Sequence, residues 1–277
     1  MVDKAGQHYW NEHWDTIPHD SFRPESPLLR HYRDRAFANV ISRALRGLPS
    51  NASVLEAGCA DSSLLVYLGR LGHKIIGVDY SPVGCDLFRQ RAAAERVEAQ
   101  VECCDIFSPP ERLMGVADCV ISSGLVEHFE DTAACVQALG AFVRPGGRIL
   151  TIIPNMRGYV GLLQRLCAPS VYAVHVPLSV AELVTAHRGG LSVVEFGHLL
   201  PAGFGVVNFH EPGLSRAGFW TRRLAVSGLG RLSWASWFVD KYIALPRSES
   251  FSPYCYCIAE RPREPGSTGA NLHQEGS

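Results

Sequence analysis

Residues 54–63 contain the sequence feature that most limits how this chain can fold. Two apolar residues are followed by a carboxylate, by small residues around Gly58, and then by a polar pair and an apolar run. Gly58 permits unusual backbone dihedrals and close approach of a ligand, and Ser62 or Ser63 can cap a helix. A second apolar strand at 75–79 ends in another carboxylate. Strand, turn, helix, strand and acid together predict a nucleotide-binding βαβ unit.

Glu56 indicates which nucleotide this turn would bind. A dinucleotide-binding turn carries three glycines, whereas this one has Gly58, with Ala60 and Ser63 at the other two places. A carboxylate beside the turn would repel a pyrophosphate, but it suits the sulfonium and ammonium groups of S-adenosylmethionine. Asp79 would then accept hydrogen bonds from the ribose hydroxyls. The alternative is that Glu56 is a strand-end acid near solvent.

Composition argues against several other classes of protein. The 277 residues suffice for one large domain or for one domain with a smaller cap. The net charge of -1 argues against a nucleic-acid partner. We find no apolar run long enough to span a bilayer, and residues 1–8 lack the apolar core of a signal peptide, so we expect a cytoplasmic protein with reduced cysteines. Cys255 and Cys257 have no second Cys/His pair nearby, so we expect no metal site.

Residues 53–154 alternate short apolar strands with helices, which predicts an α/β, Rossmann-like parallel sheet wound on both sides. Residues 144–147, with one proline and two glycines, are expected to end the last of these helices. The expected strands are 53–57, 74–79, 99–104, 116–122 and 147–153, and the expected helices are 62–71, 83–97 and 131–143. We expect an N-terminal aromatic arm and helix at 1–50, a cofactor-binding core at 51–200, a Trp-rich insertion at 201–253, a final strand at 254–261 and a disordered tail at 262–277.

Polar residues follow the third and fourth strands, where a sheet of this kind binds its ligands. Asp105 can accept from an adenine amino group while Ile106 packs on the ring. Ser122 and Ser123 would meet the methionine end of the cofactor. His128 follows on a loop or short helix, beside the position expected for the methyl group.

Five different motifs follow one another along the chain, at 54–60, 77–79, 104–106, 122–128 and 139–154. Their order and spacing resemble the class I S-adenosylmethionine-dependent methyltransferases, and most of all the small-molecule branch that includes the ubiquinone and menaquinone methyltransferases. The resemblance implies that Glu56, Gly58 and Ala60 surround the methionine part and that Ser122 binds its amino group. It implies that Asp79 holds the ribose, that Tyr80 lies beside the adenine, and that Asp105 and Ile106 bind the adenine. Cys59 and Ser123 are also expected to bind the cofactor.

The resemblance also implies a seven-stranded, mostly parallel sheet whose last strand is antiparallel. Residues 191–197 and the alternating stretch 254–259 fit the last two strands. Ser179 and Glu182 form the sequence of a capping box at the start of the helix before them.

Aromatic residues and prolines crowd residues 6–35, which predicts a turn-rich arm, followed by a helix at about 28–45. Such an arm could fold over a ligand, with Tyr9, Trp10 and Trp14 as an apolar wall and Arg35 reaching a ligand carboxylate. Alternatively, these aromatic side chains have no role toward a ligand and serve to attach the arm to the domain.

Two insertions, at 156–177 and 201–253, are expected to bind the acceptor substrate. They supply His175 and His210, and the second contains three of the five tryptophans together with several basic residues. The second insertion has three alternative roles: an apolar lid over a hydrophobic acceptor, a homodimer contact, or a helix lying on a membrane surface.

These features predict transfer of a methyl group, by in-line displacement, to a hydrophobic or aromatic small molecule, with secondary metabolism as one setting. An alcohol or ammonium acceptor must lose a proton, and His128 is the first candidate for the base, followed by His175 and His210. A phenolate or thiolate acceptor would need no base. Whether oxygen, nitrogen, sulfur or carbon is methylated stays open. The alternatives are an NAD(P)-dependent oxidoreductase and a non-catalytic binding protein with the same fold.

Overall fold

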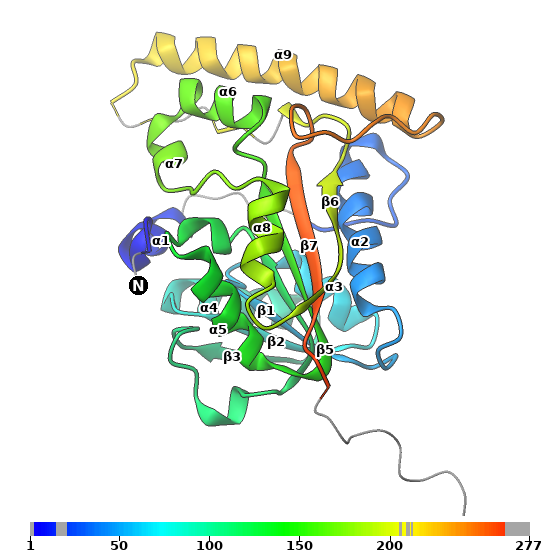
Figure 1. Ribbon diagram of the computed structural model, residues 1–277. Coiled ribbons are helices and arrows are strands. Elements are labelled where there is room, and N and C mark those ends of the chain that lie inside the picture. Colours follow the sequence, from blue (N-terminus) through cyan, green and yellow to red (C-terminus); the bar gives the residue numbers. More distant parts are fainter. Residues whose placement is uncertain (1–2, 15–20, 205–206, 209–210, 212, 264–277) are drawn as a thin grey trace, which may run out of the picture.

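The computed structural model describes residues 3–14, 21–204, 207–208, 211 and 213–263. Within these residues a seven-stranded sheet has the order β3-β2-β1-β4-β5-β7-β6 (Figure 1). Strand β7 is antiparallel to both of its neighbours, and the pairings from β3 to β5 are parallel, so the predicted fold class is confirmed. The strands are β1 Ser53–Ala57, β2 Lys74–Asp79, β3 Ala99–Cys103, β4 Ala117–Ser123, β5 Val143–Pro154, β6 Ser192–Leu199 and β7 Tyr254–Glu260.

The order of the strands reverses between β1 and β4, and this reversal positions the site. In a sheet of this type, ligands bind beyond the carboxyl ends of the strands at such a switch point. Ala57 at the end of β1 is paired with Val78 on one side and Ser122 on the other. The residues that follow these three positions therefore surround one crevice.

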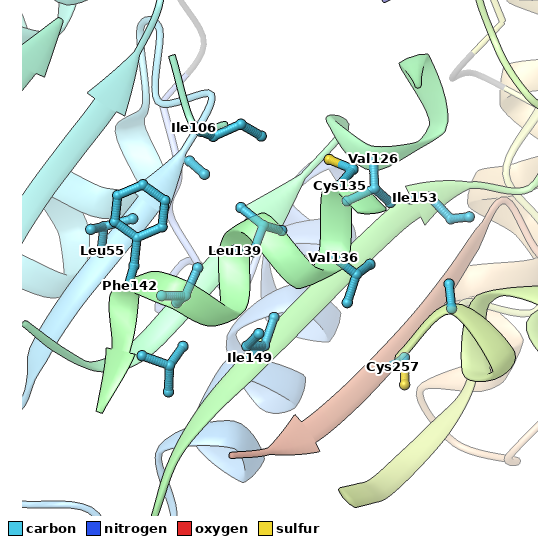
Figure 2. Packing of buried hydrophobic residues seen from close by; sticks show 14 of the residues in the cluster. Leu55, Ile106, Val126, Cys135, Val136, Leu139, Phe142, Ile149, Ile153 and Cys257 are labelled. Atoms are coloured by element: carbon cyan, nitrogen blue, oxygen red, sulfur yellow. The ribbon is translucent and has the colours of Figure 1, made fainter. Parts of the chain in front are cut away.

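Helices cover both faces of the sheet because adjacent residues of the central strands β1, β4 and β5 are apolar and point to opposite faces. Leu55, Val120 and Ile149 pack against α5 (Thr132–Phe142) and α8 (Val180–His187); Figure 2 shows Leu139 and Phe142 of α5 within this cluster. The neighbouring residues of the same strands pack against α2 (Tyr32–Leu45), α3 (Ser63–Arg70) and α4 (Pro82–Ala94).

Side-chain caps fix where the helices begin. Ser62, Ser81 and Asp131 accept hydrogen bonds from backbone N–H groups in the first turns of α3, α4 and α5, respectively. The predicted capping box of Ser179 and Glu182 is present at the start of α8. Three short 3₁₀ turns, Leu29–His31, Glu111–Leu113 and Val126–His128, complete the core.

Two local expectations were wrong. Residues 6–14 form helix α1 (Gly6–Trp14) rather than a turn-rich arm, because the prolines of this region begin only at Pro18. The helix before residues 144–147 ends at Phe142, as expected, but the next strand begins earlier than 147. Strand β5 starts at Val143, and its pairing with β4 shifts register between Ala117 and Cys119, with Gly146 at φ +76°.

The two insertions form helices at one end of the molecule. Residues 156–177 contain α6 (Tyr159–Cys167) and α7 (Pro169–Ala173), and the later insertion contains α9 (Arg216–Asp240). Figure 1 shows α9 lying across α6, and the contact is a small apolar cluster of Val160, Val207 and Val226. Among the described helices, none combines the length and the hydropathy that crossing a bilayer requires. The division of the chain into functional regions stays a prediction.

Candidate cofactor and active site

The turn after β1 wraps around the end of β2. Gly58 has φ +72°, and its N–H donates to the Val78 carbonyl at 2.8 Å. A Cβ at this position would approach Leu125 Cδ1 to 3.3 Å, so glycine keeps the turn close to the loop after β4. Ala60 also has positive φ, +34°, and donates its N–H to Asp79 Oδ2 at 3.0 Å. The Asp79 carboxylate therefore holds the turn in place.

A first cavity of about 430 Å³ lies beyond β2 and β3. Four of the predicted cofactor residues line it: Asp79, Tyr80, Asp105 and Ile106. Burial raises the pKa of Asp79, although backbone N–H groups of Ser81 and Ala60 oppose the shift. Trp10 lines the same cavity from α1. The first cavity thus combines carboxylates with apolar and aromatic surface, as an adenosine site requires.

Helix α1 is fixed over this cavity by polar contacts. Gln7 donates from Nε2 to the Tyr80 carbonyl, and Ser81 donates from Oγ to Asn11 Oδ1 at 2.7 Å. Tyr80 in turn donates its hydroxyl to Asp3 at 2.6 Å. The N-terminal segment is therefore attached to the residues that follow β2.

A second cavity of about 460 Å³ lies on the other side of the turn. Glu56, Cys59 and Ala60 line it. Burial is the main cause that raises the pKa of Glu56, to about 8; Ser62 donates its hydroxyl to this carboxylate and opposes the shift. A cation bound nearby would favour the ionised form. The apolar lining comes from Phe22, Phe37, Leu64, Ile152, Ile153, Pro154, Met156 and Tyr254.

The two cavities meet at a shared set of residues, which contribute to the lining of both. Trp14 ends α1, Gly58 forms the turn after β1, Ser123 ends β4, and Gly124 and His128 follow it. A molecule that extends from the first cavity into the second must pass these residues. His128, the predicted base, therefore lies at the junction.

His128 and His175 face each other, with ring centroids 4.5 Å apart. Each ring has Nδ1 near a backbone carbonyl, His128 at 2.8 Å from Val174 O and His175 at 2.6 Å from Val171 O. Because a carbonyl only accepts, Nδ1 carries the proton and Nε2 the lone pair in each neutral ring. Burial lowers the pKa of His175, which favours its neutral form.

Glu127 completes this cluster. Its side chain is buried, and neither carboxylate oxygen has a hydrogen-bond partner among the described residues. Burial raises its pKa to about 8. One ligand atom each from Glu127, His128 and His175 lie within 4.8 Å of one another, a composition and spacing that a divalent cation could use. Sequence spacing could not reveal this group, because His175 is distant along the chain; the expectation of no metal site stays a prediction.

Several predicted residues lie elsewhere. Tyr9 packs edge-on against Trp10, at 5.1 Å between centroids, and is absent from the described lining of both cavities. Ser122 is fully buried and likewise absent from that lining, whereas Ser123 lines both cavities. Arg35 donates to the carbonyls of residues 26 and 28 rather than reaching a cavity. His210 lies outside the described residues.

Three further residues that line the second cavity were not predicted from the sequence. Arg33 lines the second cavity in place of Arg35, and Gln164 and Asn208 bring one residue from each insertion. The Asn208 N–H donates to Gln164 Oε1 at 2.9 Å, which joins the insertions at the cavity wall. The helical period of residues 28–45 could have separated Arg33 from Arg35, but nothing in the sequence pairs Gln164 with Asn208.

With this geometry established, comparison with known proteins identifies the family. A family model described as a methyltransferase domain matches residues 29–180, more than half of the chain. Ubiquinone biosynthesis O-methyltransferase of Methylocella silvestris is 28% identical over 164 residues, 55% of this chain and 61% of that protein. The protein of the same name from Acinetobacter baylyi is 30% identical over 153 residues, 53% of this chain and 60% of that protein. The chain thus spans about 60% of the length of these curated relatives.

Solved structures share the fold. Geranyl diphosphate C-methyltransferase from Streptomyces coelicolor A3(2), in complex with Mg²⁺, geranyl diphosphate and S-adenosyl-L-homocysteine, has a TM-score of 0.58 and 16% identity over 92% of this chain and 97% of that one. A geranyl diphosphate methyltransferase in complex with sinefungin has a TM-score of 0.55 and 18% identity over 83% of this chain and 80% of that one. The chain therefore belongs to the methyltransferase domain family and has the fold of the class I S-adenosylmethionine-dependent methyltransferases. The class predicted from the sequence is confirmed.

Burial of Glu127 predicts a pH-dependent stability. Between its ordinary pKa of 4.5 and its folded value of about 8, the folded protein keeps a proton that the unfolded chain releases. The free energy of unfolding must therefore fall as pH rises through this window. We would measure the free energy of unfolding in urea at pH 5 and pH 8, in EDTA and without cofactor. Between these two pH values it should fall by a few kcal/mol less in Glu127→Gln than in the native protein. Glu130→Gln, at an exposed neighbour, is the control; equal falls in all three proteins would contradict the burial of Glu127.

Proposed function

We propose that this protein binds S-adenosylmethionine across the two cavities and transfers its methyl group to a hydrophobic or aromatic small molecule. The observation that carries the proposal is the meeting of the two cavities at Gly58, Ser123 and His128. The adenosine part fits the first cavity, the methionine part passes the glycine turn, and the acceptor enters from the second cavity. This arrangement brings donor and acceptor together in a confined space.

The residues present suit this cofactor. Asp79 lies at the end of β2, where its carboxylate can accept from ribose hydroxyls, and Asp105 and Ile106 line the far side of the same cavity. Glu56 places a buried carboxyl where a sulfonium and an ammonium would lie. Burial raises the pKa of this carboxyl to about 8, and a cation bound beside it would favour the ionised form.

The chemistry divides between cofactor and protein. The cofactor supplies a sulfonium whose methyl group is open to in-line displacement. Trp10 lines the first cavity and Trp14 lines both, so their rings would exclude water from a bound cofactor. His128, with Nδ1–H donated to Val174, presents a basic Nε2 that can take the proton of a hydroxyl or amine acceptor. His175 beside it is a second proton acceptor at the same place.

The lining of the second cavity and the names of the curated relatives both support a chemical class for the acceptor. Aromatic and aliphatic side chains such as Phe22, Phe37 and Met156 suit a hydrophobic or aromatic molecule. The curated relatives named ubiquinone biosynthesis O-methyltransferase support oxygen as the methylated atom, ahead of nitrogen or carbon. A biosynthetic role, including one in secondary metabolism, is consistent with such an acceptor.

Asp79→Asn tests the cofactor site. The change keeps the shape of the side chain but removes one acceptor and the negative charge. Calorimetric titration should show an affinity for S-adenosylhomocysteine that is lower by about tenfold to a hundredfold. Asp86→Asn, at an exposed position of α4, should leave the affinity unchanged. An unaltered affinity in a folded Asp79→Asn protein would refute the assignment of Asp79 to the ribose.

His128→Ala tests the base. Once an acceptor has been found by mass spectrometry of a panel of phenols and other hydroxylated aromatic compounds, turnover by this variant should be slower by about a hundredfold or more. The affinity for S-adenosylhomocysteine should change little, and the acidic limb of the pH–rate profile should disappear. His8→Ala, an exposed histidine of α1, is the matched control. A rate and pH profile like those of the native protein would exclude His128 as the base.

A further inference from the structure

The outward face of α9 carries exposed apolar residues toward both of its ends. Trp220, Leu224, Trp234 and Phe238 repeat at intervals that place them on one side of a helix. Their exposed fractions are 53%, 70%, 51% and 57%, and Tyr242, one turn further on, is 68% exposed. An apolar stripe of this length on a soluble surface indicates an interaction site.

The opposite side of α9 is firmly attached to the protein, so the stripe cannot turn inward. Val226 packs in the cluster with α6, and Trp237 donates its indole N–H to the Ala202 carbonyl at 2.6 Å. Asp240 accepts from the Tyr32 hydroxyl at 2.6 Å and from the Arg247 guanidinium at 2.7 Å. Figure 1 shows the helix lying across one end of the molecule, with its outer side turned away from the sheet. None of the described residues of α9 lines either cavity, so the stripe does not serve as a lid in this conformation.

The exposed charges on this helix are all positive. Exposed cations are interspersed with the apolar residues: Arg223 lies over the Trp220 ring at 4.9 Å and Lys241 over the Tyr242 ring at 5.6 Å. Within residues 213–247 the one acid is Asp240, which is buried against Arg247. The exposed cations of α9 and its C-cap residue are Arg216, Arg223, Arg231 and Lys241.

These charges distinguish a lipid surface from a second copy of the chain. In an antiparallel contact between two copies of α9, Arg231, at the middle of the stripe, would face the same residue of the other copy, with no exposed acid of the helix to pair with it. A bilayer surface supplies both complements, since the acyl boundary accepts the aromatic and aliphatic side chains and the phosphates accept the cations.

We propose that the outward face of α9 docks in the plane of a bilayer surface that contains anionic phospholipids. The helix lies on the membrane without crossing it. Binding requires neither cofactor nor acceptor, so the proposal is independent of the methyl-transfer reaction. The adjoining α6, from the first insertion, has exposed apolar residues of its own: Tyr159, Leu162 and Leu166.

Co-sedimentation of the full chain with vesicles tests this proposal. The native protein should bind phosphatidylcholine vesicles that contain phosphatidylglycerol, bind phosphatidylcholine alone about tenfold or more weakly, and lose affinity as salt increases. The double variant Leu224→Asp/Phe238→Asp should lose binding to both vesicles. Arg223→Gln/Arg231→Gln should lose about tenfold or more on the anionic vesicles alone.

A matched control uses exposed apolar residues remote from α9. Leu71 and Met114 are 57% and 51% exposed, and Leu71→Asp/Met114→Asp should bind vesicles like the native protein. Circular dichroism and S-adenosylhomocysteine titration verify that every variant is folded. Failure of the native protein to bind anionic vesicles, or equal binding by Leu224→Asp/Phe238→Asp, would overturn the proposal. So would a lipid-free dimer in sedimentation velocity that this double variant breaks, because the stripe would then be covered by a second copy.

Discussion

The Asp79 carboxylate is the interaction on which the site depends. Its two oxygens accept from the backbone N–H groups of Ala60 and Ser81, at 3.0 and 2.8 Å. One side chain thereby ties the turn after β1 to the end of β2 and to the start of α4. Ala60 has a left-handed conformation, which is unfavourable for a residue with a Cβ, and its hydrogen bond to Asp79 stabilises that conformation. The separation of the two cavities follows from the position of this turn.

Burial of carboxyl groups around this turn gives the site its electrostatic character. Glu56 and Glu127 are both fully buried, and burial raises each pKa to about 8. Isolated buried carboxyls lower the stability of a protein at neutral pH. Such groups are typical of sites that bind a positively charged ligand or move protons. A sulfonium cofactor beside Glu56, and proton transfer or a cation beside Glu127, would each account for the arrangement.

Local patterns in the sequence were sufficient to predict the sheet and to place polar residues at its strand ends. Apolar runs and caps predicted the strands and helices of 53–154 to within a few residues, and Asp79 and Asp105 lie in the cavity expected of residues that follow parallel strands. Their roles toward the cofactor stay predictions. Distinguishing Ser122 from Ser123 required knowledge of which way each side chain points on β4. Distinguishing Arg33 from Arg35 required the orientation of α2.

The features of the site that were not predicted depend on contacts between distant parts of the chain. Gln164 and Asn208 meet through one hydrogen bond, and His175 meets His128 across a long separation in sequence. The insertions themselves were evident from composition, but their packing was not. Whether α9 covers the acceptor or faces outward is decided by Val226 and Trp237, which attach it to the body by one side.

Parallel calorimetric titration of the purified chain with S-adenosylhomocysteine and with NADH determines which of the two ligands the turn at Gly58 accepts. Glu56 at the turn should admit the adenosyl ligand, with a dissociation constant on the order of micromolar, and should exclude the pyrophosphate of NADH. Binding of S-adenosylhomocysteine alone is the predicted result. Binding of NADH alone would contradict the account and would place the chain among the oxidoreductases, while binding of neither would indicate a methyltransferase fold without cofactor-dependent chemistry.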